Sequence, residues 1–99
     1  MKRYSKSRMD TFYKKGDASL HVECIVEISD DALVLMYRNT AGEFVEYVGE
    51  AQGPGHYLLR GKGFPSASTL HRIEDYLVLE GSYDEDGELG MWRILLKDE

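Results

Sequence analysis

The sequence has little cysteine and no long apolar run. Its 99 residues include one cysteine, Cys24, and two prolines. A single cysteine cannot form an internal disulfide, and no stretch approaches the roughly 18 apolar residues of a membrane helix. A signal-peptide hydrophobic region is also missing. These absences favour a protein of a reducing compartment that does not enter a membrane, and we expect it in the cytoplasm.

Recognisable catalytic motifs are missing as well. The chain has no Cys-x-x-Cys, no His-x-x-x-His, no Gly-x-Ser-x-Gly elbow and no convincing pair of carboxylates. The glycine-containing stretches 49–55 and 61–66 lie between expected strands and do not open a helix, so they lack the context of a phosphate-binding loop. We therefore expect no catalytic residues, no cofactor and no enzymatic activity.

The sequence contains possible metal ligands but no metal-binding motif. His21, His56 and His71 fall on three expected strands, and Glu23 or Cys24 could complete a zinc site. The spacing gives no support, so we expect surface or rim histidines and a Cys24 buried in the core. The acidic turn 84–88 resembles a calcium loop superficially, but its glycine is placed to close a hairpin.

Charge divides the chain unevenly. The net charge is −6, yet residues 1–15 hold six of the twelve basic side chains against the single acid Asp10, which leaves −11 for the remainder. An acidic body repels phosphate backbones, so nucleic-acid binding is not expected. We interpret residues 1–15 as a solvated or loosely docked basic arm and residues 16–99 as one domain, since 42% hydrophobic residues suffice for a core.

Alternating apolar residues predict an all-β fold. Expected strands cover residues 20–28, 33–38, 43–48, 56–60, 68–73, 76–85 and 88–96, joined mostly by short turns. About seven strands in an up-and-down antiparallel meander would close into a small barrel or half-barrel. Residues 66–77 also suit a helix capped by Ser66, but a strand places Leu70 beside Leu79 on the core face.

The strand after the turn at residues 39–42 leaves an ambiguity. One register puts Phe44, Glu46 and Val48 on the inner face, where a carboxylate is costly to bury. A one-residue slip or bulge instead turns Val45 and Tyr47 inward, or leaves Glu46 at the rim.

Residues 76–96 predict a β-hairpin that closes at Asp86-Gly87. This register pairs Gly81 with Trp92, Tyr83 with Gly90 and Glu80 with Arg93, so that each glycine lies opposite a large aromatic side chain. One face of the hairpin belongs in a core and collects Leu77, Leu79, Tyr83, Trp92, Ile94 and Leu96. The reverse face carries Glu80 and Arg93 as an ion pair, but also Val78, Leu89, Met91 and Leu95.

The segment Leu-Glu-Gly-Ser-Tyr, Asp-Gly and Gly-Met-Trp-Arg-Ile-Leu-Leu resembles the closing hairpin of small calycin-type, lipocalin-like barrels. The resemblance covers about a fifth of the chain. It differs from true lipocalins because Gly90-Met91-Trp92 lies on the last strand and because the chain is short for an eight-stranded barrel with a helix. The resemblance implies a barrel and, more weakly, a small ligand.

Two functional hypotheses follow. The first is a non-enzymatic interaction domain that self-associates or docks a protein through Val78, Leu89, Met91 and Leu95, because such apolar patches usually mark a partner. The second is a lipocalin-like carrier of a small apolar ligand inside the barrel, where an apolar pocket needs a few polar anchors. Its expected ligand-binding residues are Tyr37, Phe44, Glu46 and Trp92.

Overall fold

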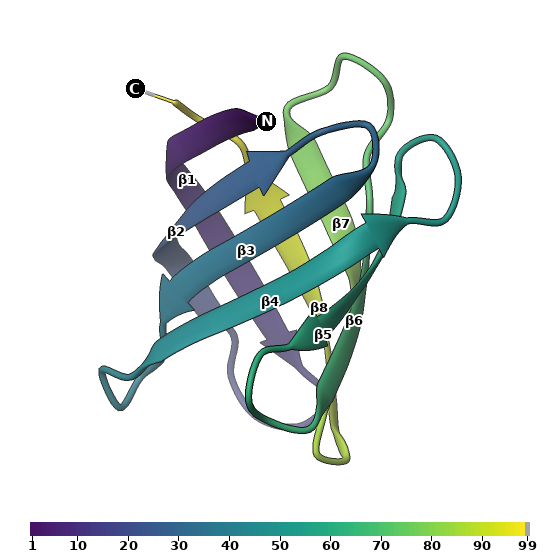
Figure 1. Cartoon of the computed structure of the whole chain (residues 1–99). Coiled ribbons are helices and arrows are strands. Elements are labelled where there is room, and N and C mark those ends of the chain that lie inside the picture. Colours follow the sequence, from purple (N-terminus) through teal and green to yellow (C-terminus); the bar gives the residue numbers. More distant parts are fainter. Residues whose placement is uncertain (99) are drawn as a thin grey trace.

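The computed structural model describes residues 1–98 and has a closed antiparallel barrel (Figure 1). Each strand pairs with the next along the chain, and the last strand returns to the first. The strands are β1 Lys2–Tyr13, β2 Ser19–Ile28, β3 Ala32–Arg38, β4 Phe44–Ala51, β5 His56–Gly61, β6 Ser66–His71, β7 Val78–Glu85 and β8 Glu88–Leu95. The predicted all-β, up-and-down antiparallel barrel is confirmed, with eight strands in place of about seven.

The additional strand is β1, in the segment expected to be a basic arm. It pairs with β2 on one side and with β8 on the other, and so closes the barrel. Its buried side chains are Tyr4, Ser7, Met9 and Thr11. A register shift between Tyr4 and Ser7 interrupts their alternation, so the strand pattern is hidden in the sequence.

The basic residues of β1 project outward, and Lys2, Arg3 and Arg8 pair with acidic neighbours. Arg3 lies 2.8 Å from Glu27, and Lys2 lies 2.8 Å from Asp98. The segment is therefore part of the barrel wall, with its charges in solvent. The same arrangement brings the two ends of the chain together, since the Lys6 amide donates to the Lys97 carbonyl (Figure 1).

The β7–β8 hairpin has the predicted register. Gly81 faces Trp92 and Tyr83 faces Gly90. Asp86 and Gly87 have φ of 51° and 89°, the positive values that a type I′ turn needs at both central positions. Leu77 was expected in the core but is 53% exposed, because β7 begins only at Val78 after a turn.

The β3–β4 turn decides which side of β4 faces the core. Arg38 pairs with Phe44, so the turn holds five residues instead of the expected four. The Asn39 side-chain oxygen accepts hydrogen bonds from the amides of Ala41 (3.0 Å) and Glu43 (2.9 Å), which fixes the longer turn. Val45 and Tyr47 are consequently buried, as the slipped register predicts.

Two further segments complete the comparison with the sequence. Residues 66–71 form strand β6, which confirms the preferred assignment, while residues 72–77 form a turn containing Asp75 at φ 68°. Leu20 was expected inside but is 55% exposed, because the positive φ of His21 (58°) breaks the alternation at the start of β2.

The described part of the chain contains no helix that is long and apolar enough to cross a membrane.

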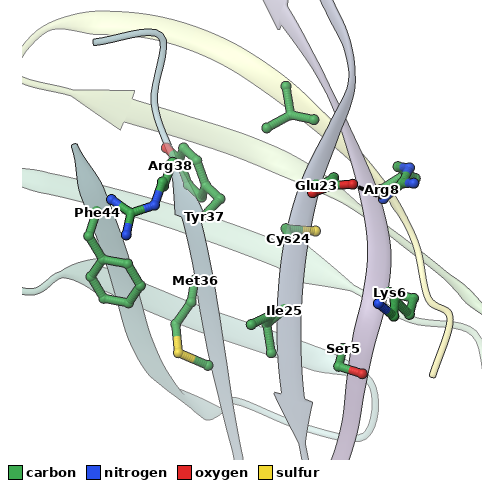
Figure 2. A pocket seen from close by; sticks show the side chains of 11 residues that line it. Ser5, Lys6, Arg8, Glu23, Cys24, Ile25, Met36, Tyr37, Arg38 and Phe44 are labelled. Atoms are coloured by element: carbon green, nitrogen blue, oxygen red, sulfur yellow. Dashed lines mark ion pairs between the residues drawn. The ribbon is translucent and has the colours of Figure 1, made fainter. Parts of the chain in front are cut away.

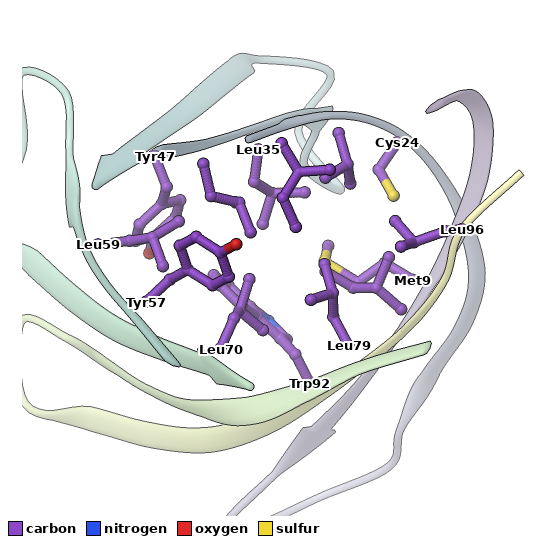
Figure 3. Close-up of a cluster of buried hydrophobic side chains, with 14 of the residues drawn as sticks. Met9, Cys24, Leu35, Tyr47, Tyr57, Leu59, Leu70, Leu79, Trp92 and Leu96 are labelled. Carbon is purple, nitrogen blue, oxygen red and sulfur yellow. The ribbon is translucent and has the colours of Figure 1, made fainter. Parts of the chain in front are cut away.

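Inward-facing side chains from all eight strands fill the barrel (Figure 3). Trp92 lies at the centre of an aromatic cluster: its ring stacks on Tyr83 at a centroid distance of 5.0 Å and packs edge-on against Tyr47 at 5.0 Å and Tyr37 at 6.3 Å. Such pairs add to the burial of the rings themselves. The core hydrophobic residues are Tyr4, Met9, Cys24, Val26, Ile28, Leu33, Leu35, Val45, Tyr47, Tyr57, Leu59, Leu70, Leu79, Tyr83, Trp92, Ile94 and Leu96.

Candidate interaction surfaces

The predicted interaction residues lie on the outer surface of the hairpin. Met91, Leu95 and Leu89 are 58%, 48% and 45% exposed, and Val78 is half-buried. They point outward because their neighbours in β8, Trp92 and Ile94, point into the core. The sequence therefore placed this apolar face correctly.

Strand β1 widens the apolar surface beyond the hairpin. Phe12 pairs with Met91, Asp10 pairs with Arg93 and Arg8 pairs with Leu95. Phe12 is 43% exposed. We call the outer surface formed by Asp10, Phe12, Val78, Leu89, Met91, Arg93 and Leu95 the β8 face. Sequence reasoning missed Phe12 because its segment was assigned to a basic arm.

A row of charges crosses the β8 face. Glu80, Arg93 and Asp10 are opposite one another on β7, β8 and β1. The expected Glu80–Arg93 ion pair is not among those formed by residues 1–98, in which no carboxylate oxygen lies within 4.0 Å of the Arg93 guanidinium. Asp10 instead accepts a hydrogen bond of 2.9 Å from the His21 amide. Arg93 is thus a cation on an apolar surface with its charge open to another group.

The four residues expected to bind a ligand inside the barrel do not share a cavity. Tyr37 and Trp92 face the interior, but Phe44 is 58% exposed and Glu46 lies outside, 3.5 Å from the Lys62 amino group. The five-residue turn before β4 is the reason, because it reverses the faces assumed for Phe44 and Glu46. The prediction that Glu46 is a polar anchor inside the barrel is therefore wrong.

Tyr37 and Phe44 do line a groove of about 550 Å³ on the side of the barrel formed by β1 to β4 (Figure 2). The β1 irregularity at Ser5 and Lys6 borders it. Ile25, Met36 and Phe44 supply apolar side chains, while the basic side chains flank them: Arg38 lies beside Phe44, and Lys6 and Arg8 lie across the groove. Arg8 is 3.4 Å from Glu23, and Arg38 donates to the Gly42 carbonyl at 3.0 Å.

Cys24 is buried in the core, as expected. Burial raises the pKa of its thiol to about 12, with a smaller opposing effect from Arg8. The reactive species of cysteine is the thiolate, so a thiol in this environment is chemically inert at neutral pH.

All three histidines are at the surface, as predicted, but two of them meet. His56 on β5 and His71 on β6 are directly opposite, and their Nδ1 atoms are 2.7 Å apart. His21 lies elsewhere, on β2, with its Nδ1 4.0 Å from Asp10. Within residues 1–98, no group of three or more His, Cys, Asp or Glu side chains is arranged to hold a metal ion. Sequence reasoning put the histidines on separate strands and missed the pair, which the expected β5–β6 pairing could have revealed.

Compared with known proteins, the chain matches no protein-family model, no curated protein and no solved structure. The eight-stranded antiparallel barrel is consistent with a small calycin-type barrel, and the comparisons identify no lipocalin relative.

Proposed function

We propose that this protein is a non-enzymatic interaction domain of the cytoplasm that self-associates through the β8 face. The observation that supports this best is the exposure of Phe12 on β1 and of Leu89, Met91 and Leu95 on the adjacent strand β8. Contiguous apolar surface of this kind usually marks a binding site, because leaving it in water is unfavourable. The occupant we infer is a second copy of the chain.

The pairing of β1 with β8 makes the β8 face complementary to itself. Consider two barrels stacked face to face about a twofold axis that runs parallel to these strands and passes between them. Such a rotation exchanges β1 with β8 and keeps each residue at its height along the strand. Met91 then meets Phe12 of the second copy, and Arg93 meets Asp10 of the second copy, with each contact made twice.

This arrangement gives the charged row a role. Arg93 has no carboxylate partner among residues 1–98 of its own chain, so a carboxylate from the second copy would satisfy it. Charges of this kind contribute more to the orientation of a complex than to its affinity. The apolar side chains would supply most of the binding free energy, and the Arg93–Asp10 contacts would fix the register.

Sedimentation velocity over a range of protein concentrations tests the proposal. We expect wild-type protein to dimerise and Met91→Lys to be monomeric at the same concentrations, because two lysines would be buried at the centre of the interface. The control is Leu58→Lys, which changes an outward side chain of similar exposure (40%) on β5. A monomeric wild-type protein at high concentration, or equal association of both variants and wild type, would contradict the proposal.

Charge reversal distinguishes association in the proposed register from non-specific association. Arg93→Glu would place acidic groups against Asp10 of the second copy and should weaken association by about tenfold or more. Arg60→Glu reverses an outward charge on β5 and should leave it unchanged. Equal effects of the two substitutions would indicate a response to net charge alone and would rule out the register proposed here.

The groove of Figure 2 supports a second candidate function, the binding of a small anionic amphiphile. Its apolar side chains suit an alkyl or aryl group, and Lys6 and Arg38 form no ion pair within residues 1–98, so they could receive a carboxylate. This retains Phe44 as a ligand-binding residue but moves the ligand to the outer surface, where Tyr37 lines the groove although its ring packs against Trp92 in the interior.

Titration with dodecanoate, below its micelle concentration and followed by amide NMR shifts, tests this candidate. We expect shifts around the groove that saturate, and weaker binding in Phe44→Ala and Arg38→Gln. Phe12→Ala, which removes a comparably exposed phenylalanine from the β8 face, should bind as wild type does. Shifts that do not saturate, or that persist in Phe44→Ala and Arg38→Gln, would exclude the groove.

A further inference from the structure

The contact between His56 and His71 is created by the register of two strands. The residues are directly opposite on β5 and β6, their ring centroids are 4.9 Å apart, and the rings are inclined by 72°. Both side chains are exposed. The two Nδ1 atoms lie 2.7 Å apart, which requires one nitrogen to donate and the other to accept.

The distance between the two nitrogens is close to what one metal ion would need. Imidazole nitrogens bind first-row divalent metals at about 2.0 Å, so two ligands at 90° would be about 2.8 Å apart and two at a tetrahedral angle about 3.3 Å apart. The observed 2.7 Å is nearest to the 90° arrangement. Metal binding would require the donating Nδ1 to lose its hydrogen, by a shift of tautomer that protonates Nε2 of the same ring. Rotation of the exposed rings about their side-chain torsions would then bring both lone pairs onto one ion.

The surroundings favour a cation. The pair borders a surface hollow of about 460 Å³ that is also lined by Glu74 and Glu80, and Glu80 is the β7 neighbour of His71. Neither carboxylate is close enough to complete a three-ligand site. Their negative charge would nevertheless attract a divalent ion, and water would fill the remaining coordination positions. Arg72 lines the same hollow, and its Nε atom donates to the Tyr76 carbonyl at 2.7 Å. Its positive charge offsets one of the two carboxylates, so the hollow keeps an excess of negative charge.

We propose that His56 and His71 form a two-histidine surface site for a divalent transition metal, with Cu²⁺ preferred. Cu²⁺ binds nitrogen ligands most tightly in its series and favours the tetragonal geometry that a 90° pair provides. Two protein ligands leave positions open, so the bound ion would be accessible to solvent and to further ligands. The site is separate from the groove, but it borders the β8 face, because Val78 lines the same hollow and Glu80 is the β7 neighbour of Arg93.

Titration with CuCl₂ in a weakly chelating buffer tests this site by isothermal calorimetry and electron paramagnetic resonance. We expect one equivalent to bind with an axial spectrum and hyperfine coupling to two nitrogens. His56→Ala and His71→Ala should each weaken that binding by about tenfold or more and remove the two-nitrogen signature.

The matched control is His21→Ala, which removes the third histidine and should leave both the affinity and the spectrum unchanged. Circular dichroism of the metal-free variants establishes that each remains folded. Copper bound with the wild-type affinity and spectrum in His56→Ala and His71→Ala would lie elsewhere, for example at the terminal amine, and would overturn the proposal. Failure of the wild-type protein to bind at millimolar copper would do the same.

Discussion

Gly81 and Gly90 both lie opposite an aromatic residue, but a side chain is excluded at the two positions for different structural reasons. At Gly90, a Cβ atom would collide with the ring of Tyr83, so the aromatic side chain does occupy the space above the glycine. At Gly81, the collision would be with the backbone carbonyl of Thr69 on β6. The absence of a side chain there allows two strands to approach closely, which helps a small sheet to curl into a barrel.

Substitution of Gly81 therefore tests the packing of β6 against β7. Gly81→Ala should lower the free energy of unfolding by about 3 kcal/mol, because a backbone carbonyl cannot move aside without disturbing the sheet. Gly16→Ala is the control: its φ of 97° is strained for alanine, but no atom lies within 4 Å, so we expect a loss of only about 1 kcal/mol. Urea denaturation measures both. Gly81 is not among the glycines with positive φ, so a loss no larger than that of Gly16→Ala would show that the sheet relieves the contact with the Thr69 carbonyl at little cost.

At the scale of the elements, β1 closes the barrel although it lies in a segment rich in basic residues, which is typical of a solvated terminus. Removal of residues 1–15 should abolish cooperative unfolding, because it would expose the edges of β2 and β8 together with the core around Met9. Lys2→Gln is the control for charge, since it removes only exposed interactions, the Lys2–Asp98 ion pair and the contact of the Lys2 ammonium with the Tyr4 ring, and should change the melting temperature little. A truncated protein that still melts cooperatively near the wild-type temperature would mean that the barrel does not need its first strand.

Local signals explain which elements could be predicted from the sequence. Asp86-Gly87 between β-rich runs determined the β7–β8 register residue by residue, and with it the outward position of Met91 and Leu95. Where the period of two is interrupted, as at the β1 irregularity or after His21, the alternation no longer tells which side faces inward. A single extra residue in the turn at Asn39 was enough to move Glu46 from the interior to the surface.

The candidate sites depended on pairings between distant segments, which is why they were only partly predictable. The hairpin half of the β8 face follows from one local register, whereas Phe12 joins it only through closure of the barrel. The His56–His71 contact likewise needs the β5–β6 register, for which the sequence offers no turn as diagnostic as Asp-Gly.

For the whole molecule, the core contains weak acids that hold their protons to higher pH in the folded barrel than in the unfolded chain. Burial raises the pKa of Cys24 to about 12 and is likewise the main reason that the pKa of Tyr47 rises to about 12. Burial also raises the pKa of Tyr37 well above its usual range. The folded state therefore holds these protons at pH values where the unfolded chain releases them.

This difference predicts that the barrel loses stability in alkaline solution. Below pH 8, Cys24 is protonated in both states and has no effect on the pH dependence. From about pH 9, the unfolded thiol ionises while the folded one does not, so the free energy of unfolding should fall by about 1.4 kcal/mol per pH unit. The buried tyrosines should steepen the decline above about pH 10.

Urea denaturation in the presence of a reductant, at intervals from pH 7 to pH 10, measures this slope. Cys24→Ala should be less stable at pH 7 but nearly flat between pH 8.5 and pH 9.5, whereas an identical slope in both proteins would assign the alkaline loss to other groups.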